Sequence, residues 1–154
     1  MSILIKNTKK QNTCESFKKS FIEYNGYNIV KLPDKGNDAL YLCDGKLMYI
    51  NNLNYDKSLS TKSIDFKISG NNKIIYIYDK TTEEEGGAQA NQYKDAVDFA
   101  KQAIQCANEN IRYISLLDGE YYKKRWDYLS KYNSDFTYVC NIESIFNILK
   151  KWNV

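Results

Sequence analysis

Three charged residues lie within or at the end of two short apolar runs, and they are the candidates for chemistry in this chain. Asp65 lies within Ser63–Ile68, and the next apolar run, Lys73–Tyr78, ends at Asp79 and Lys80. The Ile, Phe and Tyr content of these runs predicts two neighbouring β-strands joined by a turn. Carboxylates on adjacent strands, with a lysine where one strand ends, can hold a divalent ion beside a phosphate. Asp65, Asp79 and Lys80 are therefore the candidate residues for such a site.

The composition excludes several other kinds of active site. The chain has no histidine, which excludes Ser-His and Cys-His nucleophilic catalysis and histidine-ligated zinc. Its four cysteines lack the C-x-x-C spacing of a zinc or redox site; they are Cys14, Cys43, Cys106 and Cys140. Hydrolysis would therefore depend on carboxylates, lysine and a metal bound by oxygen ligands. The net charge of +3, from 22 basic and 19 acidic residues, neither requires nor excludes a nucleic-acid partner.

The length of 154 residues predicts a single domain spanning 1–154. We find no signal peptide and no apolar run near 18 residues, so we expect a reduced, soluble, cytoplasmic protein with no membrane partner.

Hydrophobic periodicity predicts an α/β fold with a central mixed β-sheet flanked by helices. Phe17, Phe21 and Tyr24 form a helical stripe, and the residues before it suggest an edge strand at Met1–Ile5. The next strands are expected at 40–43 and 46–50, a hairpin with an Asp-Gly turn, and then at 63–68 and 73–78. A strongly periodic helix at 89–107 leads to a strand at 111–117, a helix near 122–129, a strand at 136–140 and a last helix N-capped by Asn141.

This order, α-β-β-β-α-β in its core, resembles that of the PD-(D/E)xK nucleases, with restriction endonucleases as the closest analogues. Asp65 occupies the place of the family's "P-D" strand, and Asp79-Lys80 ends the following strand. Gly86-Gly87-Ala88-Gln89 is similar to a glycine-rich loop that some restriction enzymes carry after the active-site strand. Leu117–Tyr122 looks like their strand-ending "T-D-G-x-G-W" stretch.

The chain departs from the family pattern of an acid, any residue, then a lysine. Counting back from Lys80 places Tyr78 at the acid position, and counting from Asp79 places Thr81 at the lysine position. Neighbouring residues of a regular strand point to opposite faces, so a bulge or a strand end is needed to bring Asp79 and Lys80 together. Otherwise the site is degenerate or recruits an acid from elsewhere, such as Glu15, Glu23 or the run Glu83–Glu85. Asp65-Phe66-Lys67, with Asp38 as its first acid, is a lower-ranked second motif.

The resemblance implies metal-assisted phosphodiester hydrolysis with Mg²⁺, for which Mn²⁺ is a substitute. Asp65 and Asp79 would hold the ion and Lys80 would act on the attacking water or the leaving charge. The loop and helix start around Gly86, Gly87, Gln89 and Asn91 would contact phosphates of double-stranded DNA. Further DNA contacts would come from the polar loop Asn51–Thr61. The protein would work as a type II restriction enzyme, as a homodimer or with a larger recognition subunit.

Simpler interpretations stay open at each position. Asp79-Lys80 is also typical of an exposed hairpin end, Glu83–Glu85 of a solvated loop, and Asp118-Gly119 of a turn after a strand. The alternative function is a catalytically degenerate DNA-binding or scaffolding subunit of a restriction-type complex. A third hypothesis is a protein-binding α/β module, such as an immunity factor.

Overall fold

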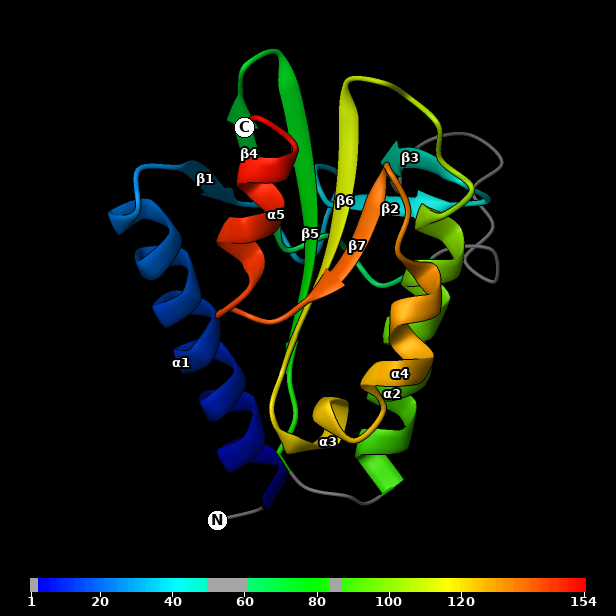
Figure 1. The fold of residues 1–154 in the computed structure, drawn as a ribbon. Helices are drawn as coiled ribbons and strands as arrows, with labels where there is room; N and C mark the ends of the chain where they lie inside the picture. Colours follow the sequence, from blue (N-terminus) through cyan, green and yellow to red (C-terminus); the bar gives the residue numbers. More distant parts are fainter. Residues whose placement is uncertain (1–2, 50–60, 84–86) are drawn as a thin grey trace.

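A computed structural model describes residues 3–49, 61–83 and 87–154 (Figure 1). Its elements in chain order are α1 (Ile3–Tyr24), β1 (Asn28–Lys31), β2 (Leu40–Cys43), β3 (Lys46–Tyr49), β4 (Phe66–Gly70), β5 (Lys73–Thr81), α2 (Gly87–Ala103), β6 (Ile111–Asp118), α3 (Glu120–Lys123), α4 (Trp126–Leu129), a 3₁₀ helix (Ser130–Tyr132), β7 (Thr137–Cys140) and α5 (Ile145–Lys151). No helix in these described ranges has the length and apolar character needed to cross a membrane.

Five strands form one mixed sheet in the order β1-β4-β5-β6-β7, which confirms the predicted α/β class. β1, β4 and β5 are antiparallel neighbours, whereas β5, β6 and β7 run parallel. The change of direction follows from the connections, because a short turn joins β4 to β5 while α2 crosses over from β5 to β6. The predicted hairpin at 40–50 is present as β2 and β3, but it forms a separate two-stranded sheet.

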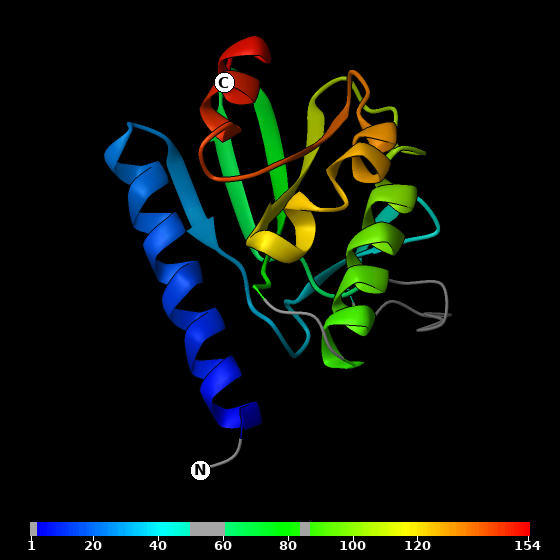
Figure 2. The ribbon, with the colours of Figure 1, turned by 60° about the horizontal axis from the view of Figure 1, so that its bottom comes forward.

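Helices cover both faces of the sheet (Figures 1 and 2). On one face, Ile22 of α1 and Ile145 and Leu149 of α5 pack against apolar residues of the strands. On the other face, α2, α4 and β2 contribute residues such as Phe99 and Leu42. The carboxyl ends of β5 and β6 lie side by side and face α1 at the turn that carries Lys18 (Figure 2).

The N-terminal region differs most from the predicted elements. Ile3–Ile5 belong to α1, so the edge strand predicted there is wrong for the described part, and Met1 and Ser2 lie outside the described residues. The strand at that edge is instead β1, which is only four residues long and too short to show a clear alternation in the sequence.

The aromatic stripe of α1 also does not face the core as a helical stripe normally does. Phe17 is 62% exposed and Tyr24 is 89% exposed, whereas Lys18 and Ile22 are buried. Phe21 packs edge-on against Phe146 of α5, with ring centroids 5.5 Å apart. The helix therefore presents a charged residue, Lys18, to the carboxyl edge of the sheet.

Two further elements are shorter than predicted. The region near 122–129 forms two single-turn helices, α3 and α4, and the last helix begins only at Ile145. Asn141 makes the predicted N-cap hydrogen bond in the turn that leads into α5, because its side-chain oxygen accepts from the Ser144 N–H (3.0 Å) and its carbonyl from the Ile145 N–H (3.0 Å).

Candidate functional site

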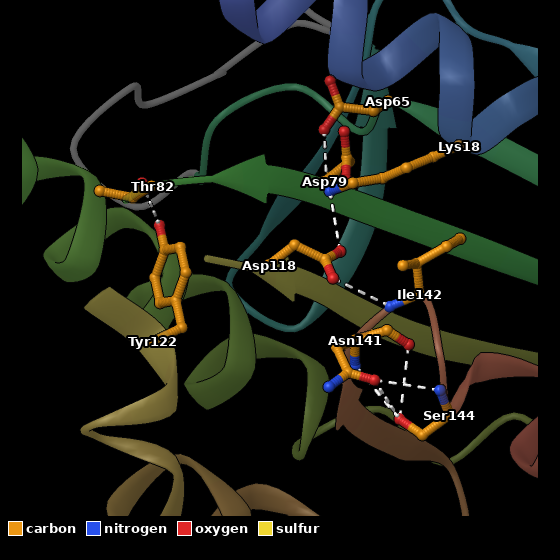
Figure 3. Close-up of polar contacts among 9 residues, drawn as sticks. All are labelled: Lys18, Asp65, Asp79, Thr82, Asp118, Tyr122, Asn141, Ile142 and Ser144. Carbon is orange, nitrogen blue, oxygen red and sulfur yellow. Dashed lines mark hydrogen bonds and ion pairs between the residues drawn. The ribbon is translucent and has the colours of Figure 1, made fainter. Parts of the chain in front are cut away.

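Acidic residues collect where the central parallel strands end, beneath α1 (Figure 3). Asp79 lies near the end of β5 and Asp118 is the last residue of β6. Ile77 and Leu116, two residues earlier on each strand, pack in the core between the sheet and α1 and α5. Because side chains alternate along a strand, Asp79 and Asp118 face the same side.

Lys18 of α1 joins these two carboxylates. Its ammonium group lies 2.6 Å from Asp79 Oδ1 and 3.0 Å from Asp118 Oδ2. The side chains of Lys18 and Asp79 are only 4% and 2% exposed. Burial lowers the pKa of Lys18, but the two carboxylates raise it by more, so the pKa lies above its ordinary value and the group stays charged.

Asp65 lies immediately before β4 and reaches the backbone of Asp79. Its Oδ2 accepts a hydrogen bond of 2.7 Å from the Asp79 N–H, while its own N–H donates to Ile77 O at 2.9 Å. Asp65 Oδ1 is 3.5 Å from the ammonium of Lys31. The structure thus places the Asp65 carboxylate against the backbone of Asp79, the other residue predicted as a metal ligand.

Burial dominates the ionisation of Asp65. Desolvation raises its pKa to about 8, the Asp79 N–H and Lys31 lower it, and the nearby carboxylates of Glu15 and Asp79 raise it further. The pKa of Asp79 is also raised by burial; Lys18 opposes this shift, whereas Glu15 and Asp118 add to it. The interpretation of Asp79 as an exposed hairpin end is therefore wrong.

Asp118 is fixed from the side opposite Lys18. Its Oδ1 accepts a hydrogen bond of 3.1 Å from the Ile142 N–H, in the segment that follows β7 (Figure 3). A pocket of about 480 Å³ opens beside it, with Trp126 and Asn141 among its lining residues. Asp118 therefore links the Lys18–Asp79 pair to the ends of all three parallel strands.

Lys80 does not join the site. The pairing of β5 with β6 runs without interruption from Ile74↔Ile111 to Thr81↔Asp118, so no bulge brings Lys80 to the face of Asp79. Lys80 follows the alternation of Tyr78, which packs toward α2. The residue that shares the face of Asp79 two positions later is Thr81, and the ammonium group present at this edge is that of Lys18.

Of the other acids that the sequence offers for this site, one lies near Asp65 and Asp79 and others lie elsewhere. Glu15 lies near Asp65 and Asp79 and is 3.6 Å from Lys31. Glu23 instead pairs with Lys19 on the outer side of α1, and Glu83 accepts a hydrogen bond of 3.4 Å from the Glu120 N–H. Glu84 and Glu85 lie outside the described residues. Asp38, the first acid of the second motif, is exposed, and the described residues show no ion pair between it and Lys67.

The proposed DNA-contacting residues lie at the start of α2. Gly86 and most of the loop Asn51–Thr61 lie outside the described residues. Gly87 is the first residue of α2; Gln89 is half-buried and Asn91 is exposed in its first turns. Their contacts with phosphate stay predictions.

The carboxylate oxygens of Asp65 and Asp79 suit a Mg²⁺ ion whose remaining ligands are water molecules or phosphate oxygens. Within residues 3–49, 61–83 and 87–154, no three acidic or cysteine side chains converge closely enough to enclose a metal ion. Mg²⁺ is usually held by one or two carboxylates together with water and substrate phosphate oxygens. The Asp65–Asp79 pair meets this smaller requirement in ligand type and number.

Lys18 and Lys31 are the members of the site that the sequence did not indicate. A usable signal exists for Lys18, because Glu15, Lys18 and Ile22 are spaced i, i+3 and i+7 and so share one helical face. Comparisons of this chain with protein-family models, with curated proteins and with solved structures find no match.

Proposed function

We propose that this protein is a Mg²⁺-dependent endonuclease that hydrolyses phosphodiester bonds in double-stranded DNA, in the manner of type II restriction enzymes. The observation that carries the proposal is the contact of Asp65 with Asp79: both residues are buried, and the Asp79 N–H holds the Asp65 carboxylate at 2.7 Å. The pair lies at the carboxyl edge of the parallel strands, where α/β sheets commonly bind ligands.

The local charge balance supports a cation at this pair. The ion pairs around Lys18 and Lys31 join these two ammonium groups to five carboxylates, those of Glu15, Asp34, Asp65, Asp79 and Asp118. If all seven groups are ionised, three negative charges are in excess, which favours a bound cation. Burial is the main cause of the raised pKa of Asp65, and the nearby carboxylates of Glu15 and Asp79 add to it, so a cation at the pair would favour the ionised form.

The roles of the residues follow from this arrangement. A bound Mg²⁺ supplies Lewis-acid chemistry, since it stabilises negative charge on a phosphodiester and activates water for attack. Asp65 and Asp79 hold the ion, and Glu15 adds negative potential beside them. Lys80 has no contact with the pair, because it lies on the opposite face of β5.

Cleavage of supercoiled plasmid tests the proposal. We expect nicked or linear DNA with Mg²⁺ or Mn²⁺ and none in EDTA, for the chain alone or together with the product of a neighbouring gene as a recognition subunit. Asp79→Asn keeps the side-chain shape and should abolish cleavage, whereas Lys80→Met should retain it. Absence of cleavage under every one of these conditions would reject the catalytic proposal.

A second candidate is a DNA-binding or scaffolding subunit without catalytic activity. The observation that favours it is the Lys18–Asp79 ion pair, whose side chains are 4% and 2% exposed, so that Asp79 already has a cation partner. This function predicts salt-dependent DNA affinity that EDTA leaves unchanged. It also predicts that Asp65→Ala retains DNA binding.

A further inference from the structure

The buried turn of α1 is charged, although a helix that packs on a sheet normally does so through apolar residues. Ile22 packs in the core, and one turn earlier Lys18 is buried over the carboxyl edge of β5 and β6. Burying an ammonium group costs free energy unless an oppositely charged group pairs with it. The position of Lys18 is therefore explained by its two carboxylate partners.

Those partners hold Lys18 from two directions. Its ammonium group contacts Asp79 Oδ1 at 2.6 Å and Asp118 Oδ2 at 3.0 Å. The other oxygen of Asp118 is occupied by the Ile142 N–H at 3.1 Å. The position of Asp118 is thus fixed by the backbone. Lys18 bridges Asp118 and Asp79, so it also restrains the Asp79 carboxylate.

Asp79 has one oxygen engaged and one oxygen available. Oδ1 is occupied by Lys18, while the described residues show no hydrogen bond or ion pair to Oδ2. A carboxylate whose first oxygen is fixed in this way presents the second in a defined direction. The Asp65 carboxylate lies beside Asp79, held by the Asp79 N–H at 2.7 Å (Figure 3).

We infer that Lys18 is a positioning residue for the divalent ion, which holds Oδ1 of Asp79 so that Oδ2 and the Asp65 carboxylate can bind the ion together. The inference rests on the proposed function and adds α1 to the site. Partners that orient metal-ligating carboxylates are commonly worth about 10- to 100-fold in metal affinity. Lys80, one residue from Asp79 but on the other face of β5, provides a matched control.

Binding of Mn²⁺ to the full chain at pH 7, measured from the electron paramagnetic resonance signal of the free ion, tests this role. The variants are Lys18→Met, Lys18→Arg, Asp118→Asn and Lys80→Met. We expect Lys18→Met to weaken binding at least about tenfold. Asp118→Asn should weaken it in the same direction, because Lys18 loses its second partner. Lys18→Arg should recover most of the affinity, and Lys80→Met should bind as the wild type does.

Thermal unfolding in EDTA accompanies each measurement, so that binding is compared only where the variants are folded. Should Lys18→Met fail to fold, Lys18→Arg and Asp118→Asn decide the question. Wild-type affinity in folded Lys18→Met, or in Asp118→Asn if Lys18→Met is unfolded, overturns the role of Lys18 and leaves the proposed function standing. Failure of the wild type itself to bind Mn²⁺ overturns the proposed function and, with it, this inference.

Discussion

Asp65 is expected to make the stability of the protein depend on pH in an unusual direction. Burial raises its pKa to about 8 in the folded chain from an ordinary value of 3.8, so the folded state binds this proton more tightly than the unfolded state does. Its contribution to stability is fully present below about pH 4 and is lost as the pH rises through about 8. One pKa unit corresponds to about 1.4 kcal/mol, so the loss amounts to several kcal/mol at most.

Asp65→Asn should therefore stabilise the protein at high pH. The amide oxygen can still accept the hydrogen bond from the Asp79 N–H, while the buried charge is removed. We expect the free energy of unfolding at pH 9 to rise by about 2 to 4 kcal/mol, and the gain to shrink toward pH 4. Urea denaturation in EDTA at several pH values measures it. Asp127→Asn, at an exposed position, is the control for loss of one carboxylate, and an equal effect in both variants would contradict the explanation.

Prediction from sequence succeeds for the acids of this site and fails for its lysine. Asp65 and Asp79 belong to adjacent apolar runs joined by a short turn, so local pattern alone places them on neighbouring strands. Burial of Lys18 depends on Asp79, which is 61 residues away in the chain. Lysine is normally exposed, and the shared helical face of Glu15, Lys18 and Ile22 does not identify a partner at that separation.

At the scale of elements, the long periodic segments were the predictable ones. The strands at 63–68, 73–78 and 111–117 and the helix at 89–107 correspond to β4, β5, β6 and α2. Where prediction failed, tertiary contacts override the local pattern: β1 is a four-residue strand that exists because it pairs with β4. The exposed aromatic residues of α1 mimic a core-facing stripe, because periodicity alone does not say which face of a helix is covered.

The turn between β6 and α3 is the element on which the geometry of Asp118 depends. Gly119 has a φ of 105°, and a Cβ atom there would overlap with the backbone carbonyl of Thr82. That carbonyl accepts a hydrogen bond from the Tyr121 N–H at 3.2 Å, and the Thr82 N–H donates to Asp118 O at 2.9 Å. The close approach ties the end of β5 to the end of β6, and only glycine permits it.

Gly119→Ala should accordingly lower the free energy of unfolding more than the same change at another glycine. We expect a loss of at least about 3 kcal/mol, from backbone strain and from the clash with Thr82. Gly36→Ala is the matched control, because Gly36 also has a positive φ (87°) but no atom lies within 4 Å of an added Cβ. Its loss should be about 1 kcal/mol. Urea denaturation compares the two variants, and equal losses would show that the contact with Thr82 is unimportant.

At the scale of the whole molecule, the site is a junction where segments that are far apart in the sequence contact one another. The contacts around Asp79 connect α1, the approach to β4, the ends of β5 and β6, and the segment after β7. An ion bound at this junction acts on the folded state alone, because the unfolded chain does not hold Asp65 and Asp79 together. Metal binding should therefore be measurable as global stability, without any knowledge of the DNA sequence that is cut.

We expect Mn²⁺ to raise the free energy of unfolding at neutral pH by about 2.7 kcal/mol when its free concentration is 100 times the dissociation constant. The combined variant Asp65→Asn, Asp79→Asn removes both ligands and should show no increase. It is expected to fold, because both amides keep the size of the carboxylates and Asp118 remains as a charged partner of Lys18. Lys80→Met should show the full increase, since Lys80 lies on the other face of β5. Urea titrations with and without Mn²⁺ compare the three proteins. An equal increase in the combined variant would place the ion elsewhere on the molecule and remove Asp65 and Asp79 from the proposed mechanism.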